Sequence, residues 1–305
     1  MAELVELPEA PEVPLWKALT HRPPPLAAGA SIPALEVRAA RVHKDAAAYA
    51  AVCGFPPGPH VPVTWPAVAC RGLQMAVMTS RVFPLPIPGI VHVRQGITWT
   101  RRIRVEEAWA ASCRVEGHRV VRSGGEFDLH TKVEIGGEVV WTAVTTILSR
   151  AIPGDGEKRP RSQEVPLRPD RSTRWSLPAD MGRRYAKVSG DWNPIHLHPW
   201  SARLFGFKRP IMHGWWLLAR ALAELDDLVP EAGRVEARFL SPVSLPGTVT
   251  FETWPAESRC AIFPKPAAAR AHAVLSFNMA SSFTFLDFTA IQPECQALIW
   301  RSISA

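Results

Sequence analysis

The sequence has few cysteines, and none of them follows a metal-binding or disulfide pattern. The 305 residues include five, at Cys53, Cys70, Cys113, Cys260 and Cys295. They lie far apart, no two form a CxxC pair, and their odd number does not suggest a disulfide framework. We therefore expect reduced and mostly buried thiols.

Secretion and membrane signals are missing as well. No uninterrupted apolar run is long enough to span a bilayer. The segment from Met1 to Pro14 carries four glutamates and several prolines, whereas a signal peptide begins with a basic region followed by an apolar one. These absences predict a soluble, cytoplasmic protein without a membrane span.

Basic residues are in excess but do not gather in runs. The 35 lysines and arginines outnumber the 28 acidic residues, and the formal net charge is +7. Such a charge suits an anionic partner, yet no helix-turn-helix, zinc-finger or RNP-like pattern accompanies it. We expect no nucleic-acid partner and favour a small anionic ligand; coenzyme A is compatible with this charge.

The sequence does contain enough apolar residues for a sizeable core. Hydrophobic residues make up 47% and charged residues 21%, as in soluble globular proteins, and the length allows two domains. Polar, proline-containing stretches at 23–33 and 151–171 are predicted linkers. We expect an N-terminal extension (1–34), a first unit (35–150), a linker (151–171) and a second unit (172–305).

Each half predicts a helix packed against an antiparallel sheet. The expected helices are 68–79, from its apolar content, and 214–228, from apolar residues at steps of three or four. Glycine pairs and Pro-Gly turns separate β-leaning segments. These segments are 106–116, 120–128, 131–135 and 138–148 in the first half, and 235–240 and 248–254 in the second.

Two further features concern the organisation of the chain. Gly89–Arg94 resembles Gly233–Arg238, 144 residues later, which supports a duplication. From Pro255 to Ala305 only seven residues are charged. This tail either supplies the closing strands of the second sheet or is an aberrant C-terminus that packs differently.

The segment from Tyr185 to Gly214 carries the chemistry. Gly190 and Pro194 bracket a tight loop that can direct Asp191 and His196 into one cavity. An acid and a base at this spacing suit proton abstraction and return, and histidine is matched to neutral pH. Asn193 between them can orient one of the pair. The N–H of Gly214, at the expected start of a helix, can stabilise an oxyanion.

The residues alone leave two other interpretations open. Asp191 could be a helix N-cap and the Asn-Pro pair a structural turn, with His196 and His198 as loop residues. A metal site from Asp191, His196, His198 and His213 is also conceivable. The metal site is disfavoured because His196 and His198 would face opposite ways in an extended chain.

The same segment resembles the signature of the MaoC-like family of (R)-specific enoyl-CoA hydratases and 3-hydroxyacyl-thioester dehydratases, roughly Y-A-x-x-S-G-D-x-N-P-I-H, A-x-x-x-G-F and I-x-H-G. The matching residues are Tyr185, Ala186, Ser189, Gly190, Asp191, Asn193, Pro194, Ile195, His196, Ala202, Gly206, Phe207, Ile211, His213 and Gly214. The resemblance implies an α+β double hotdog fold, in which each unit is a long helix wrapped by a bent antiparallel sheet. The first unit lacks the D-x-N-P-x-H loop.

The resemblance also implies the site. Asp191 and His196 would form the catalytic pair, Asn193 would orient the loop, and Gly214 would stabilise the thioester oxygen. No metal is expected, and the only carrier is the coenzyme A or acyl carrier protein of the substrate. The residues predicted to bind substrate are Tyr185, Ser189, Gly190, Pro194, Ile195, His213 and Trp215.

The activity implied is (R)-specific hydration of trans-2-enoyl-CoA to (R)-3-hydroxyacyl-CoA, or the reverse dehydration, in fatty acyl metabolism. The alternatives are a hotdog acyl-CoA thioesterase and an acyl-thioester-binding protein without turnover. A homodimer is compatible with this organisation. Two departures from the family pattern stand out. Tryptophans at 192, 200, 215 and 216 can narrow an acyl tunnel or be core or interface aromatics, and nothing after Pro255 matches the usual closing strands.

Overall fold

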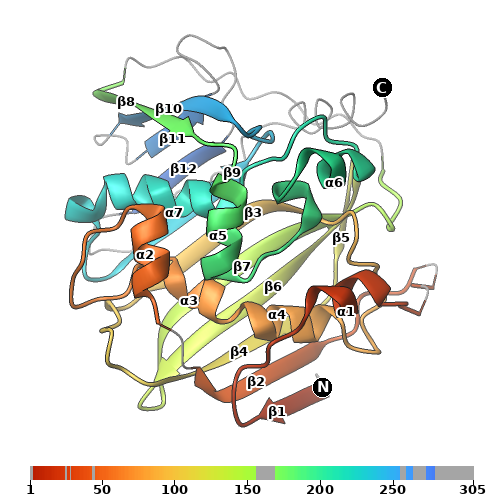
Figure 1. Cartoon of the computed structure of the whole chain (residues 1–305). Helices are drawn as coiled ribbons and strands as arrows, with labels where there is room; N and C mark the ends of the chain where they lie inside the picture. Colours follow the sequence, from red (N-terminus) through yellow and green to blue (C-terminus); the bar gives the residue numbers. More distant parts are fainter. Residues whose placement is uncertain are drawn as a thin grey trace.

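The computed structural model describes residues 3–24, 26–27, 29–42, 45–155, 169–254, 259–263 and 273–278. Its strands form one twelve-stranded sheet. In Figure 1 this sheet runs from β1 at the lower edge to β8 at the top, with helices α4 and α7 lying over it. Among the described residues, no helix is long and apolar enough to cross a membrane.

The first half of the sheet has the strand order β2-β4-β6-β7-β3. Its main strands are β2 (Leu35–Val42), β3 (Val91–Trp99), β4 (Trp109–Val115), β6 (Gly124–Ile135) and β7 (Glu138–Ser149), and the short β5 (Arg119–Val121) pairs with β6. Its helices are α1 (Leu15–Thr20), α2 (Ala47–Cys53), α3 (Trp65–Ala69) and α4 (Arg71–Met78). Strand β1 (Glu3–Leu7) adds to β2 in parallel.

The second half repeats this order as β8-β10-β11-β12-β9. Its strands are β8 (Arg171–Leu177), β9 (Gly233–Phe239), β10 (Gly247–Trp254), β11 (Arg259–Phe263) and β12 (Ala273–Asn278). Its helices are α5 (Met181–Ser189), η1 (Pro194–His196), α6 (Pro199–Leu204), α7 (Gly214–Glu224) and η2 (Asp226–Leu228). In both halves the first strand pairs with the third and the second with the fifth, so the predicted α+β double hotdog is confirmed.

Antiparallel pairing of β3 with β9 joins the two halves. In this register Arg94 and Arg238 are Cα partners. The 144-residue offset makes the same two residues equivalent, and equivalent residues face each other only next to a two-fold axis. The sequence echo therefore marks the pseudo-two-fold axis of a duplicated fold.

Among the described residues, one large apolar cluster extends through both halves. Helix α7 buries Leu218 and Leu222 completely, and β9 directs Val235 and Ala237 into the same cluster. The apolar spacing predicted for the helix follows from this one-sided burial. In the first half the buried Trp141 donates a hydrogen bond from Nε1 to the carbonyl of Val63 at 2.8 Å, which satisfies its polar atom inside the core.

One predicted boundary in the first half is wrong. Segments 120–128 and 131–135 were expected to be separate, but β6 is continuous from Gly124 to Ile135. The turn expected from Gly124-Gly125 lies directly before these glycines, at Arg122 and Ser123 between β5 and β6. The two glycines also permit close approach. A Cβ at Gly124 would lie 2.3 Å from the carbonyl oxygen of Ser149, and one at Gly125 would lie 2.5 Å from Ile152 Cδ1.

Both predicted helices also differ at their ends. The helix expected at 68–79 begins earlier, and Cys70 divides it into α3 and α4. The helix expected at 214–228 ends as an α-helix at Glu224, and a 3-10 turn follows.

Strands β11 and β12 bear on the two interpretations of the tail. They pair with each other, β11 pairs with β10, and β12 pairs with β9. For 259–263 and 273–278 the tail therefore supplies the closing strands of the second sheet. The rest of the predicted tail, and residues 156–168 of the predicted linker, lie outside the described residues.

The N-terminal segment is held against the first helix pair. After β1, the N–H of Ala10 donates to the carbonyl of Arg41 at 3.0 Å. The backbone of Pro11 then passes over Gly72, where a Cβ would lie 1.7 Å from the Pro11 carbonyl oxygen. Only a residue without a side chain permits this contact.

We predict that Gly72→Ala lowers the free energy of unfolding by about 1–3 kcal/mol, because the backbone of either Pro11 or α4 must move. Gly58→Ala is the control, since a Cβ there would meet nothing within 4 Å. Denaturant unfolding of both variants and the wild type measures the effect. Equal midpoints for the two variants would contradict this packing.

Candidate active site

The catalytic loop begins where α5 ends. Gly190 has a left-handed conformation (φ 71°), which closes the helix with a hydrogen bond from its N–H to the Ala186 carbonyl at 2.9 Å. The Ser189 hydroxyl donates to the Tyr185 carbonyl and accepts from the N–H of Asp191 at 3.2 Å. These contacts set the direction in which the chain leaves the helix.

Two side chains then fold the loop onto itself. Asp191 Oδ1 accepts a hydrogen bond from the N–H of Asn193, and Asn193 Oδ1 accepts one from the N–H of Ile195, each at 3.3 Å. Asn193 is thus the N-cap of η1. The structural interpretation is correct in that both residues shape the turn, but Asp191 itself is not a helix N-cap.

Helix α5 also contacts the backbone of His196 and of the next residue. A Cβ at Gly182 would lie 2.0 Å from the carbonyl oxygen of His196. The neighbouring Arg183 donates from Nη1 to the carbonyl of Leu197 at 2.8 Å. The close contact between the His196 backbone and α5 therefore requires a glycine at 182.

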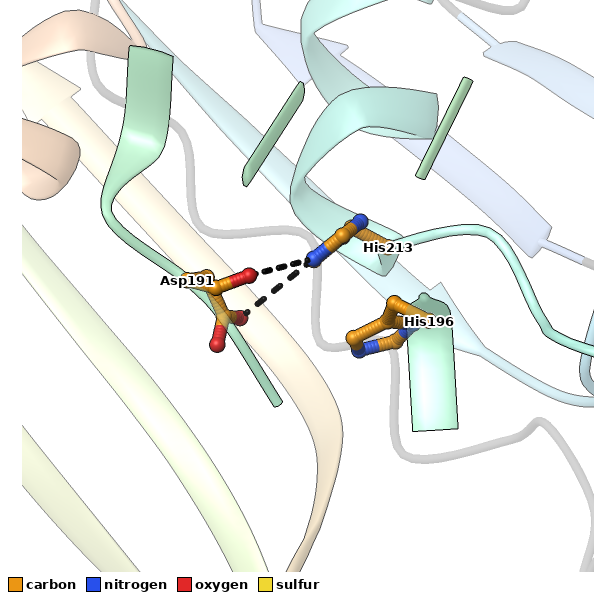
Figure 2. A group of neighbouring side chains, drawn as sticks. All are labelled: Asp191, His196 and His213. Atoms are coloured by element: carbon orange, nitrogen blue, oxygen red, sulfur yellow. Dashed lines mark hydrogen bonds and ion pairs between the residues drawn. The ribbon is translucent and has the colours of Figure 1, made fainter. Parts of the chain in front are cut away.

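The structure brings Asp191, His196 and His213 together (Figure 2). The two imidazole rings stack with centroids 3.6 Å apart and planes inclined by 27°. His213 Nε2 lies 3.1 Å from the backbone carbonyl oxygen of Asp191 and 3.9 Å from its Oδ2. His213 is thus a buried neighbour of both partners of the predicted dyad.

His196 has a defined tautomer. Its Nδ1 lies 2.7 Å from the carbonyl oxygen of Ile211. A carbonyl only accepts, so Nδ1 carries the hydrogen and Nε2 keeps its lone pair. Burial lowers the pKa of His196, against the opposing effect of Asp191. At neutral pH this side chain is therefore an uncharged base.

Asp191 is held in the opposite charge state. Burial alone would raise its pKa, but Arg71, His213, His196 and the N–H of Asn193 together lower the pKa well below the usual range for aspartate. Arg71, at the start of α4, donates from Nη2 to Oδ1 at 3.0 Å. The site at neutral pH therefore contains a carboxylate beside a neutral imidazole.

His213 and Gly214 complete the site from α7. Burial lowers the pKa of His213 to about 3, with a further contribution from His196, so it stays neutral. Gly214 is the first residue of α7, and its N–H has no acceptor one turn earlier in the helix. The positive end of the helix dipole lies at this N–H, which suits developing negative charge.

Three members of the conceivable metal site come together. The ligand atoms of Asp191, His196 and His213 lie within 4.8 Å of one another, whereas His198 is exposed on the loop. The Arg71 guanidinium on Asp191 adds a permanent positive charge where a cation would bind. The chemistry of this cluster thus favours proton transfer, and the absence of a metal stays a prediction.

The residues predicted to bind substrate have different surroundings. Tyr185 is buried and its ring lies 4.8 Å from that of His213, while Ser189 is buried behind the loop. Pro194 and Ile195 form the first turn of η1. Trp215 packs beside His92 of β3, with ring centroids 5.6 Å apart. Their roles in binding stay predictions.

The remaining tryptophans divide between core and surface. Trp216 is buried and donates from Nε1 to the carbonyl of Val52 at 3.0 Å, so it belongs to the core. Trp192 and Trp200 are exposed, at 41% and 66% of their surface. Trp200 stacks on His198 with ring centroids 6.3 Å apart. Trp216 is thus a core residue, and a role of Trp192 or Trp200 in an acyl tunnel stays a prediction.

Three neighbours of the site were missed in the sequence. They are Arg71, Gly182 and His92, a partly buried histidine whose pKa desolvation lowers to about 4. Arg71 and His92 belong to the first unit and are 120 and 99 positions away from Asp191. Spacing along the chain gives no signal for such pairs. Gly182 lies three residues before the signature begins at Tyr185, and a glycine inside a helical segment is the signal that could have identified a close approach.

Comparison with known proteins identifies the family. The MaoC like domain family matches residues 156–266. The chain is 38% identical over 205 residues to 3-hydroxyacyl-thioester dehydratase X of Mycobacterium tuberculosis, an alignment that covers 67% of this chain and 73% of that protein. The chain belongs to the MaoC-like dehydratase family. It is a hydro-lyase of the MaoC dehydratase kind, and the family match extends beyond Trp254, where the sequence resemblance had faded.

Solved structures agree with this membership. The crystal structure of HtdX of Mycobacterium tuberculosis superposes with a TM-score of 0.68 at 32% identity, covering 79% of this chain and 98% of that one. A MaoC-like dehydratase from Phytophthora capsici superposes with a TM-score of 0.62 at 19% identity, covering 88% and 100%. The second likeness concerns the fold alone.

We predict that Gly182→Ala lowers hydro-lyase activity about tenfold to a hundredfold, because the added Cβ displaces the His196 backbone and misplaces its ring. Lys187→Ala, an exposed position on the same helix, is the control. Steady-state rates and circular dichroism of both variants test this. A fully active Gly182→Ala protein would show that the loop adapts without loss.

Proposed function

We propose that this MaoC-like protein hydrates trans-2-enoyl thioesters to (R)-3-hydroxyacyl thioesters and catalyses the reverse dehydration in fatty acyl metabolism, with coenzyme A favoured over acyl carrier protein as the carrier. The observation that carries the proposal is a neutral imidazole with a free Nε2 beside an ionised carboxylate at the start of α7. Relatives named 3-hydroxyacyl-thioester dehydratase X and Enoyl-CoA hydratase ChsH3, at 38% and 33% identity, support the substrate class. The (R) configuration rests on the family resemblance.

In the hydration direction, water lies between the two residues. Asp191 accepts one hydrogen bond from the water, and Nε2 of His196 removes the other proton as the oxygen bonds to C3. The electrons of the C2–C3 double bond move toward the thioester oxygen, which the N–H of Gly214 stabilises. The imidazolium of His196 then gives its proton to C2. All atoms of the water are retained in the product.

Dehydration follows the same path backwards. His196 takes the C2 proton, the enolate-like oxygen is stabilised at Gly214, and His196 returns the proton to the hydroxyl that leaves C3 as water. Asp191 stays ionised throughout and stabilises the transient imidazolium across the site. Asp191 cannot act as the acid at neutral pH, because its lowered pKa leaves it unprotonated.

The organisation of the chain belongs to the same proposal. Catalysis is assigned to the second unit (172–305), with the first unit (35–150) lacking the loop. Substrate contacts are assigned to the residues named for that role in the sequence analysis, among them Trp215 and His213. A cytoplasmic location and a homodimer are compatible with this assignment.

We predict that Asp191→Asn and His196→Gln each lower kcat/KM by a factor on the order of 100 to 10,000, because each removes one half of the proton-transfer pair. His198→Gln is the matched control, an exposed histidine two residues away. Loss of enoyl-thioester absorbance with crotonyl-CoA and a longer trans-2-enoyl-CoA measures the rate, and chiral analysis identifies the product.

The same assay separates the alternatives. Release of free thiol without a 3-hydroxyacyl product would identify a thioesterase. Binding of the enoyl thioester without turnover by the folded wild type would identify an acyl-thioester-binding protein. Full activity in either dyad variant would contradict the assigned roles.

We also predict the acid limb of the pH profile. Hydration requires neutral His196, and the lowered pKa of His196 keeps it neutral below its ordinary value of 6.5. The kcat/KM value should therefore hold its plateau below pH 6.5 and fall only at lower pH. A profile of kcat/KM against pH, corrected for unfolding, measures this. A decline that begins above pH 6.5 would contradict the neutral, buried base.

A further inference from the structure

The first unit lacks the catalytic loop but still reaches the site. Arg71 begins α4 of that unit, and its guanidinium lies 3.0 Å from Asp191 in the second unit. Both side chains are partly buried, with 25% and 29% of their surface exposed. The ion pair is thus shielded from solvent more than a surface pair, and it crosses between the two hotdog units.

We propose that Arg71 is a positioning residue for the hydration reaction, which holds the Asp191 carboxylate in place through its ion pair. This inference rests on the proposed function. It assigns to the first unit a direct part in the chemistry of the second.

The contacts of Asp191 show how the carboxylate is held. Oδ1 accepts from both Arg71 Nη2, at 3.0 Å, and the Asn193 N–H, at 3.3 Å. Oδ2 lies 3.9 Å from His213 Nε2, beyond hydrogen-bond distance. With Oδ1 occupied, Oδ2 is the oxygen available to a substrate water. Arg71 therefore decides which oxygen acts and in which direction it points.

Arg71 is also the cation of the site. The titratable groups that face Asp191 are Tyr185 of α5, His92 of β3, His196, His213 and Arg71. Burial raises the pKa of Tyr185 and lowers the pKa of each histidine, so these groups are neutral at pH 7. Within the described part of the chain, Arg71 provides the permanent positive charge opposite the carboxylate.

Arg71 acts on His196 as well. Its charge contributes to lowering the pKa of His196, after burial as the larger cause. Removing this charge therefore raises the pKa of Asp191 and that of His196 together. Both changes move the acid limb of activity in the same direction, toward higher pH.

The backbone next to Arg71 is in close contact with the N-terminal segment. At Gly72, the next residue, the Pro11 backbone packs directly against α4. The start of α4 is therefore pinned, and an arginine there can hold a constant geometry. A planar guanidinium with several donors keeps such a geometry better than a lysine ammonium on a flexible chain.

The test compares Arg71→Gln and Arg71→Lys with wild type. We expect Arg71→Gln to lower kcat about tenfold or more with a change in KM of less than about threefold, and to move the acid limb to higher pH. Arg71→Lys should restore the acid limb and part of kcat. A third variant, Arg71→Ala, tests chemical rescue. Free guanidinium ion should restore part of the kcat of Arg71→Ala and leave the kcat of Asp191→Asn unchanged.

Arg102→Gln is the matched control. Arg102 forms another arginine–carboxylate pair between the units, with Asp226 at 3.4 Å and 17% and 23% of the side-chain surfaces exposed. It is expected to keep the wild-type kcat and pH profile. If Arg71→Gln behaves like this control, or loses activity with an unmoved pH profile and no guanidinium rescue, the inference is overturned.

A second readout does not depend on turnover. The ring-proton resonance of His196, assigned by its loss in His196→Gln, is titrated in the free protein and in Arg71→Gln. A higher pKa for His196 in the variant supports the electrostatic role of Arg71, and an unchanged pKa overturns it. An inactive wild type would count against the proposed hydration alone, since this titration still decides the role of Arg71.

Discussion

The pairing of β3 with β9 is the constraint on which the rest of this structure depends. It fuses two hotdog sheets into one and sets their helices in a fixed relation around a pseudo-two-fold axis near Arg94 and Arg238. Because of this relation, the start of α4 in the first unit meets the loop that follows α5 in the second. A candidate site that sequence assigns to one unit is thereby completed by the other.

The site depends on neighbouring desolvated groups that differ in charge state, with neutral histidines beside an ionised aspartate. His196 and His213 are buried and His92 is partly buried, and all three stay neutral because desolvation penalises their charged form. Asp191 suffers the same desolvation, yet a guanidinium and a backbone N–H compensate for it. One carboxylate and one neutral base therefore coexist within a few ångströms, which is the charge arrangement that reversible proton transfer needs.

Much of the fold could be predicted because local patterns and burial agree. The apolar spacing of α7, the antiparallel meander of the first half and the 144-residue echo all follow from faces that pack on one core. The prediction failed at β6, which was divided into two segments although it is one strand. At Gly124 and Gly125 the absent side chain serves contact with Ser149 and Ile152, and such a contact is invisible along the chain.

The sequence by itself determined the family and the candidate residues Asp191, Asn193, His196 and Gly214, because they stand in a signature at fixed spacing, whose loop folds through local hydrogen bonds. Only the tertiary structure decided the tautomer of His196, the ionisation of Asp191 and the ion pair of Asp191 with Arg71. Those properties depend on desolvation and on charges at a few ångströms, and the residues responsible lie up to 120 positions away in the chain.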